Sequence, residues 1–438
     1  MKRTIEAALL GSVILAGSAC NEESPVAPDG DLFPVRAATV EVRLEWDEFA
    51  SNLEVLGGFG SPSELGAAVL AKGFAGELDS RALARFGPFP AATSVRDTTG
   101  TIRSDSLLAF VSGRVVAVFD TVASTNEGPV TLALGALQAE WDATTATWTT
   151  AVDTIHDTRM WPEPGAGPVV ALGTRTWDPA EGDSVVFDVD SATISLLADT
   201  TDESRGIRLD LLSDGVRLQM SRVTLRIDTR ASIRPDSLVV LSAPASELTF
   251  VYTPFPEPPP DGIRIGGAPS WRTVLDVDPP RTLDGPAEVC RVLGCPLKLT
   301  PNTVGYAALV FRSRASDPAF QPTDSVGLDV RTVLSREALP KSPLGGSLLG
   351  AFGVTGLRVA PEAFGSDPGR AIEIPITPFI RSILQAEADS TELPPRTLAL
   401  LSPFEPISIA FASFQGPGGP SAPVLRMILT SGPTVELP

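Results

Sequence analysis

Short runs in which apolar and polar residues alternate dominate this chain, and they predict an all-β fold. In residues 39–46 every second side chain, from Val40 to Trp46, is apolar, and successive side chains of a strand point to opposite faces. The 41 prolines and 38 glycines punctuate these runs as turn formers do. Helical periodicity is confined to residues 63–71 and 380–388, where short helices are predicted. Further strands are predicted at residues 106–111, 115–120, 130–136, 184–189, 248–252, 306–312, 325–330, 372–376, 398–401, 407–411 and 424–429.

One predicted strand changes phase partway along. Residues 216–227 alternate, but the alternation slips at Ser221 and Arg222. A slip of one residue would turn every later side chain to the opposite face of the sheet. The sequence therefore predicts a β-bulge at these two residues.

Two passages share a pattern that indicates a duplicated module. Residues 81–88 and 272–279 have an arginine, two apolar positions and a closing proline at the same offsets. Each is followed later by a strand and a short helical stretch, in residues 184–197 and 371–386. Such internal similarity is typical of repeated units, and 438 residues exceed what a single core usually holds.

The predicted architecture is two tandem antiparallel β-sandwich modules of jelly-roll-like character, because the strands do not alternate with helices. The first module spans residues 37–230 and the second spans residues 240–438, with the boundary near residues 229–236. The proline cluster at residues 254–260 is the competing boundary. We interpret that cluster as a stiff loop inside the second module.

The first residues of the chain predict export. Lys2 and Arg3 precede an apolar run in residues 7–16, and small residues then lead to Cys20. Residues 1–19 resemble a bacterial lipoprotein signal peptide, whose cleavage would leave Cys20 as the site of lipid attachment. The apolar run is half of the roughly 20 residues that a membrane-spanning helix needs. The alternative is ordinary secretion with an unmodified Cys20.

A disordered acidic tether is predicted for residues 20–36, which are polar and interrupted by prolines. The predicted location is the cell envelope, as a lipoprotein of the outer membrane or cell surface. The net charge of −19 argues against nucleic acid and against adsorption to anionic lipid. Membrane contact is therefore expected through the N-terminal lipid alone.

The remaining cysteines, Cys290 and Cys295, lie close together in sequence. In an exported protein such a pair most simply forms a disulfide. Free thiols and zinc are the alternatives, but the chain contains one histidine, His156, and lacks a second cysteine pair that would complete a zinc site.

The first predicted module resembles the DNRLRE-type β-sandwich domain of secreted bacterial proteins. The resemblance covers residues 80–227 and, more loosely, residues 266–430, where the tryptophan-rich segment is missing. It implies a β-sandwich and, since some members of the family bind carbohydrate, a role in glycan binding. The segments that carry it are residues 81–86, 140–148, 185–189, 205–211 and 216–227.

No catalytic set is evident in the sequence. His156 stands alone in a polar loop, so a Ser–His–Asp or Cys–His system could be built only around that residue. Asp183, Asp188 and Asp190, with the acidic residues of 199–203, could hold calcium or simply form a solvated face. No Asp-x-Asp-x-Asp-Gly loop is present, so neither a metal nor a cofactor is predicted.

The tryptophans offer a candidate ligand site. Trp141, Trp148 and Trp161 fall in one stretch of a chain that contains only 6 tryptophans. Exposed indoles can stack on sugar rings, whereas buried indoles fill the space between sheets. We therefore expect a non-enzymatic surface protein that binds or scaffolds, with extracellular glycan as the candidate ligand. The alternatives are a polysaccharide hydrolase or lyase and a structural envelope protein that assembles with partner proteins.

Overall fold

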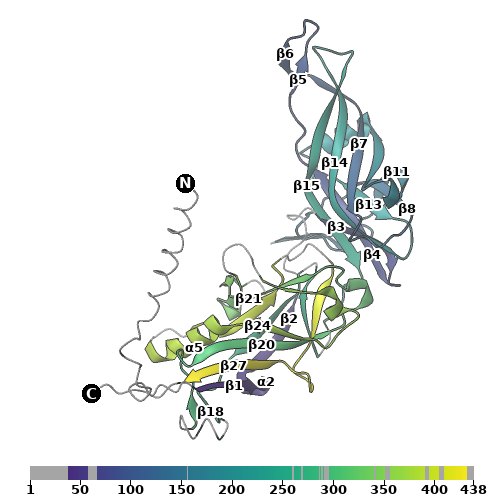
Figure 1. The fold of residues 1–438 in the computed structure, drawn as a ribbon. Coiled ribbons are helices and arrows are strands. Elements are labelled where there is room, and N and C mark those ends of the chain that lie inside the picture. The colour runs from purple at the N-terminus through teal and green to yellow at the C-terminus, as the bar shows by residue number, and fades with distance from the viewer. Residues whose placement is uncertain are drawn as a thin grey trace, which may run out of the picture.

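The alternating segments fold into two bodies made almost wholly of antiparallel strands (Figure 1). With 53% of the chain in strands and 10% in helices, the mostly-β prediction is confirmed. The computed structural model describes residues 38–57, 67–154, 156–258, 261–267, 270–285, 287, 290, 295–339, 342–350, 356–389, 394–403 and 409–431. The predicted signal peptide, the tether and Cys20 lie outside these residues.

The first body is a nine-stranded sheet in the order β11-β8-β13-β4-β15-β14-β7-β12, with β3 paired to both β14 and β4. We call it the nine-stranded body. A short hairpin of β5 (Thr93–Arg96) and β6 (Ile102–Asp105) extends from the end of this body that lies away from the second body (Figure 1). The strands of the sheet are β3 (Ala68–Phe74), β4 (Leu78–Phe86), β7 (Leu108–Asp120), β8 (Val130–Leu137), β11 (Val169–Trp177), β12 (Ser184–Asp190), β13 (Ile207–Leu211), β14 (Val216–Ala231) and β15 (Leu238–Thr253).

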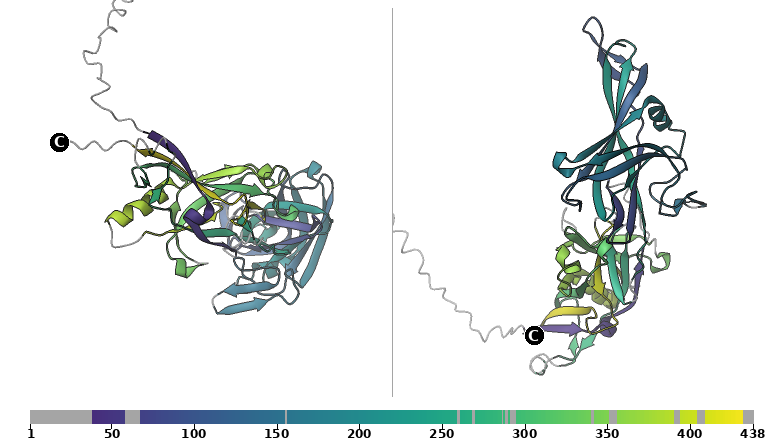
Figure 2. Two further views of the ribbon diagram at one scale, coloured as in Figure 1. Left: turned by 90° about the horizontal axis from the view of Figure 1, so that it is seen from below. Right: turned by 90° about the vertical axis from the view of Figure 1, so that its right-hand side faces the viewer.

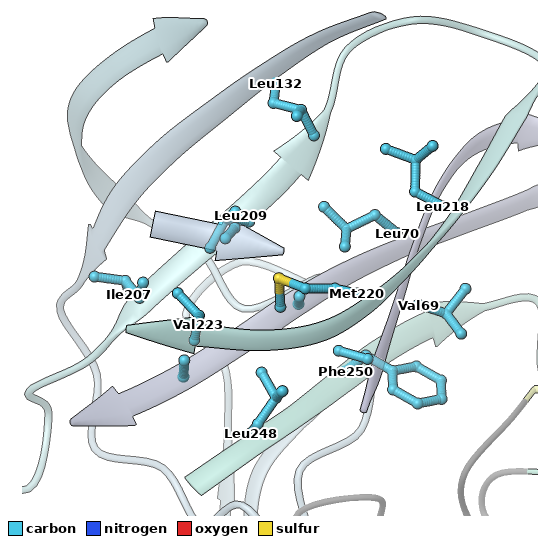
Figure 3. Packing of buried hydrophobic residues seen from close by; sticks show 14 of the residues in the cluster. Val69, Leu70, Leu132, Ile207, Leu209, Leu218, Met220, Val223, Leu248 and Phe250 are labelled. Carbon is cyan, nitrogen blue, oxygen red and sulfur yellow. The ribbon is translucent and has the colours of Figure 1, made fainter. Parts of the chain in front are cut away.

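This sheet curls until its two terminal strands lie beside each other. Arg175 of β11 and Asp188 of β12 form an ion pair with 2.7 Å between Nη2 and Oδ2. The curled sheet encloses one apolar core, to which every strand contributes, most of them through alternate residues. Figure 3 shows Leu70, Leu209 and Met220, from three different strands, within that core.

The predicted bulge in β14 is confirmed. The register of β14 against β7 shifts between Met220 and Arg222. Met220 and Val223 are both buried, whereas Ser221 and Arg222 are both exposed. The extra residue therefore lets the apolar side chains on both sides of the bulge face the same core.

The helix predicted at residues 63–71 is wrong where the structure describes it, because β3 begins at Ala68. Residues 68–71 are all buried apolar residues. Such a short apolar run lacks the polar face that would separate a helix from a strand in sequence. Pairing with β14 and β4 decides the conformation.

The second body, which we call the two-sheet body, has two six-stranded sheets. Its core takes apolar residues from both sheets and from helix α5 (Thr377–Asp389), which confirms the helix predicted at residues 380–388. The first sheet has β1 (Ala38–Leu44), β16 (Gly262–Gly266), β20 (Val304–Arg314), β24 (Ala371–Pro375), β26 (Phe411–Gln415) and β27 (Val424–Ser431). The second has β2 (Ala50–Leu56), β17 (Arg272–Val277), β21 (Val326–Val333), β22 (Leu344–Ser347), β23 (Leu357–Val359) and β25 (Thr397–Leu401).

Small elements complete the two bodies. The predicted disulfide between Cys290 and Cys295 is present, with 5.0 Å between the Cα atoms. The remaining elements are the strands β9 (Thr150–Thr154), β10 (Asp157–Met160), β18 (Thr282–Leu283) and β19 (Leu297–Lys298), the helices α2 (Trp46–Phe49) and α3 (Ser191–Ala198), and 3-10 turns at Pro179–Glu181, Pro318–Phe320, Arg336–Ala338 and Pro361–Phe364.

Strand pairing does not follow the predicted boundary between residues 230 and 240. The first strands, β1 and β2, pair with β27 and β17 of the two-sheet body. Residues 232–237 are the turn of the β14–β15 hairpin, and β15 pairs onward with β4. The chain leaves the nine-stranded body only after Thr253, at the proline cluster that was the competing boundary. The two bodies are therefore stacked end to end, with both the first and the last described strands in the two-sheet body (Figure 2).

An ion-pair network holds β1 to its sheet. Arg426 of β27 contacts Glu41 of β1 and Glu373 of β24, with N–O distances of 2.8 and 2.7 Å. Hydrogen bonds from Arg426 and then from Arg43 lower the pKa of Glu41 from 4.5 to about 2. The network therefore ties the first strand to the last one.

We predict that Glu41→Gln lowers the stability of the protein at neutral pH. A depressed carboxyl pKa stabilises the fold above the unfolded pKa, and this contribution disappears as the pH falls through the folded pKa. The stability difference between the wild type and the variant should therefore shrink as the pH falls from 4.5 to about 2. Chemical unfolding at a series of pH values measures it. Glu77→Gln, on the exposed β3–β4 turn, is the control and should show no such trend. A pH-independent difference for Glu41→Gln would contradict the prediction.

Candidate functional site

The tryptophan segment folds back over the outer side of the nine-stranded sheet. Apolar residues within 139–152 and 161–166 pack against Leu83 of β4 and Val251 of β15, and together they form a second, smaller apolar cluster. Trp141 and Trp161 belong to it and are only 3% and 5% exposed. The indole Nε1 of Trp161 donates to the carbonyl of Thr147 at 2.9 Å. Neither ring has a free face, so the structure corrects the sugar-platform interpretation for Trp141 and Trp161.

Trp148 is half-buried and one face of its ring is already occupied. The guanidinium carbon of Arg81 lies 4.8 Å from the ring centroid, and Arg81 Nη1 donates to the carbonyl of Gly165 at 2.6 Å. A Cβ at residue 165 would come within 2.9 Å of the Trp148 ring, so this close contact requires glycine. Burial lowers the pKa of Arg81. The arrangement fastens the loop to β4 and leaves Trp148 poorly placed to bind a sugar.

A second arginine repeats this contact. Arg85 stacks on Trp141 with 4.5 Å from the guanidinium carbon to the ring centroid, and it pairs with Glu247 of β15 at 2.6 Å. Cation–π contacts of this kind contribute about 0.5–2 kcal/mol each. The tryptophan-rich segment therefore acts as a second core that arginines attach to the sheet.

The other sequence candidates are separated in the structure. His156 is exposed in the β9–β10 turn. Asp188 is paired with Arg175, and Asp190 caps α3 by accepting a hydrogen bond from the Thr193 amide at 2.8 Å. Among the described residues, no group of three or more His, Cys, Asp or Glu side chains is arranged to hold a metal ion.

The structure shows a hollow of about 520 Å³ between the two bodies, which sequence reasoning missed. Its residues come from many separate segments, so no local motif could reveal it. The nine-stranded body contributes the ends of β7 and β14, and the two-sheet body contributes loops beside β16, β21 and β23. The lining residues are Ala67, Asp120, Ala123, Gln219, Ser221, Gly266, Gly267, residues 322–327, Arg358, Ser402 and Ala410.

A buried arginine and a group of aromatic rings join the bodies beside the hollow. Arg264 of β16 is 2% exposed, and its guanidinium carbon lies 4.0 Å from the centroid of Phe411. It donates to the carbonyl of Pro256 at 2.8 Å. Phe320 contacts both Phe411 and Tyr252, the latter near the end of β15. Because these rings belong to the same apolar cluster as the nine-stranded core, the walls of the hollow are held together.

Comparison with known proteins gives no relative. No protein-family model, curated protein or solved structure matches the chain. No helix in the described part of the chain is long and apolar enough to cross a membrane.

We predict that Trp161→Ala lowers the free energy of unfolding by about 3 kcal/mol or more, the cost of emptying a buried aromatic site. Trp148→Ala should cost less, since that ring is only half-buried. Urea unfolding followed by circular dichroism measures both variants. Equal, small effects would contradict the structural role assigned to Trp161.

Proposed function

We propose that this chain is a non-enzymatic exported lipoprotein of the cell envelope that binds a polar, hydroxyl-rich ligand, such as the end of an extracellular glycan. The observation that carries the proposal is the hollow between the two bodies. Ligand sites occur preferentially at domain interfaces and combine apolar walls with a few placed polar groups. The proposal also retains a β-sandwich of jelly-roll-like character for the two-sheet body, whereas the nine-stranded body, a single curled sheet, departs from that expectation.

The chemistry of the hollow supports a ligand with many hydroxyl groups. Gln219 and Ser221 line one wall and Ser325 and Arg358 line the other, with 3.3 Å between Arg358 Nη1 and Ser325 Oγ. Asp120 adds a carboxylate from the nine-stranded body. Amide, carboxylate and guanidinium groups together both donate to and accept from hydroxyls. Two walls from different bodies could enclose such a ligand from both sides.

The proposed lipid at Cys20 would hold the hollow outside the membrane. The first described strand, β1, lies at the end of the molecule remote from the β5–β6 hairpin (Figure 1). A lipid attached ahead of β1 would therefore direct the nine-stranded body away from the membrane.

Intact-mass analysis of the membrane fraction tests the anchor. We expect a chain that begins at Cys20 and carries added acyl mass. An unmodified chain, or a mature N-terminus elsewhere, would reduce the proposal to simple secretion.

We predict that Ala123→Trp abolishes ligand binding because the indole would fill part of the hollow. A glycan array with the full chain measures binding to neutral and acidic oligosaccharides. Val122→Trp is the matched control, since Val122 is 93% exposed and does not line the hollow. Binding that survives Ala123→Trp, or wild-type signals at background, would overturn the assignment of the hollow.

A further inference from the structure

Three exposed arginines form a row on the outward face of β14. Arg222, Arg226 and Arg230 stand four residues apart, and the bulge places all three on the side that faces away from the core. Among the described residues, none of the three guanidinium groups has an ion-pair or hydrogen-bond partner. With a rise of about 3.3 Å per residue, neighbouring arginines are about 13 Å apart. We call these three residues the arginine row.

The acidic groups nearest to the arginine row are already engaged. Asp228 accepts hydrogen bonds from Arg114 and Ser112 at 3.1 and 3.0 Å. Asp188, on β12, is paired with Arg175. The row therefore presents unneutralised positive charge in a protein of net charge −19.

This charge distribution concentrates a negatively charged ligand at one place. The acidic remainder of the surface repels polyanions, while the row attracts them. A straight row on an extended strand fits a linear polymer better than a compact anion, because a compact anion would reach one guanidinium only. Guanidinium groups bind carboxylates and sulfate-like groups through paired hydrogen bonds.

The surroundings of the row suit a carbohydrate polymer. Thr224 lies between two of the arginines, and Ser242 of β15 is in register with Arg226. Both supply hydroxyls. Val116 of β7 and Val186 of β12 are in register and form a partly exposed apolar strip beside the row. Hydroxyls, charges and apolar surface together match the hydroxyl groups, acid groups and C–H faces of an acidic sugar chain.

We propose that the arginine row binds an anionic polysaccharide, carboxylated or sulfated, that lies along β14. The inference rests on the proposed function only in placing the chain outside the cell. Gln219 and Ser221, which line the hollow, belong to the same outward face of β14. A polymer that follows the strand therefore reaches the rim of the hollow at one end.

The test compares binding of the full chain to immobilised polygalacturonate, dextran sulfate and neutral dextran. The wild type should bind at least one of the two anionic polymers and not dextran, with an affinity that falls steeply between about 50 and about 500 mM salt. The triple variant Arg222→Ser, Arg226→Ser, Arg230→Ser should bind about tenfold or more weakly. The polymer that is bound distinguishes carboxylate from sulfate recognition.

A charge-matched control separates the row from the total charge. The variant Lys298→Ser, Arg312→Ser, Arg370→Ser removes three exposed positive charges from the two-sheet body and should bind as the wild type does. Replacing the row by three lysines should restore part of the affinity, since lysine keeps the charge but loses the paired hydrogen bonds. Equal unfolding midpoints confirm that all variants are folded.

Three results would overturn the inference. The first is that the wild type binds neither anionic polymer. The second is that the control variant loses as much affinity as the arginine-row variant. The third is that a duplex DNA oligomer competes for binding as strongly as the polysaccharide does. Binding at the hollow is tested separately, because Ala123→Trp should leave polymer binding intact and the arginine-row variant should leave binding to the neutral oligosaccharides of the array intact.

Discussion

The register of β14 is the constraint on which the nine-stranded body depends. This strand pairs with β7 along almost its whole length and with β3 and β15 in succession on its other edge. Because side chains alternate with period two, a single register error would turn the buried Leu218, Met220 and Leu225 out into water. The bulge at Ser221 and Arg222 corrects the phase once. It also fixes which side chains remain outside, so the same feature that completes the core aligns the arginines.

The junction between the bodies sets a second constraint. The first described strands belong to the two-sheet body, the following ones to the nine-stranded body, and the strands after Thr253 to the two-sheet body again, so the described chain passes between the bodies twice. Burial lowers the pKa of Arg264, but its charge is partnered by Asp317 at 3.7 Å, by the rings of Phe411 and Trp271 and by the carbonyl of Pro256. A buried charge is tolerated only with such partners. The hollow lies beside this fixed contact, so its shape follows from the docking of the bodies.

Local patterns in the sequence predicted those features that depend on local chemistry. The alternating runs, the bulge, helix α5 and the disulfide each follow from neighbouring residues. Strand limits were less accurate: residues 106–111 and 115–120 join in β7, whose intervening Gly113 is buried and looks like a break in sequence.

The predictions that were wrong concern features that depend on residues far apart in the sequence. Residues 68–71 form a strand because β14 and β4 accept them, and β1 joins the two-sheet body because β27, near the other end of the chain, pairs with it. The burial of Trp141 could not be deduced either, since it requires Arg85 and the outer face of β4 to meet the loop. Long-range pairing leaves no signal in a single sequence.

The spacing of the arginine row destabilises the fold little through charge repulsion, and it favours the binding of a polymer over that of a small anion. Neighbouring positions of the row are about 13 Å apart along the backbone, farther than the screening length of about 8 Å at physiological salt, so their charges repel one another only weakly. Each one alone would contribute only about 0–1 kcal/mol through an exposed ion pair. A small anion that touches one arginine is therefore held weakly, whereas a chain that touches all three adds their contributions after losing its rotational and translational freedom only once. The spacing of Arg222, Arg226 and Arg230 thus favours ligands that are long as well as negatively charged.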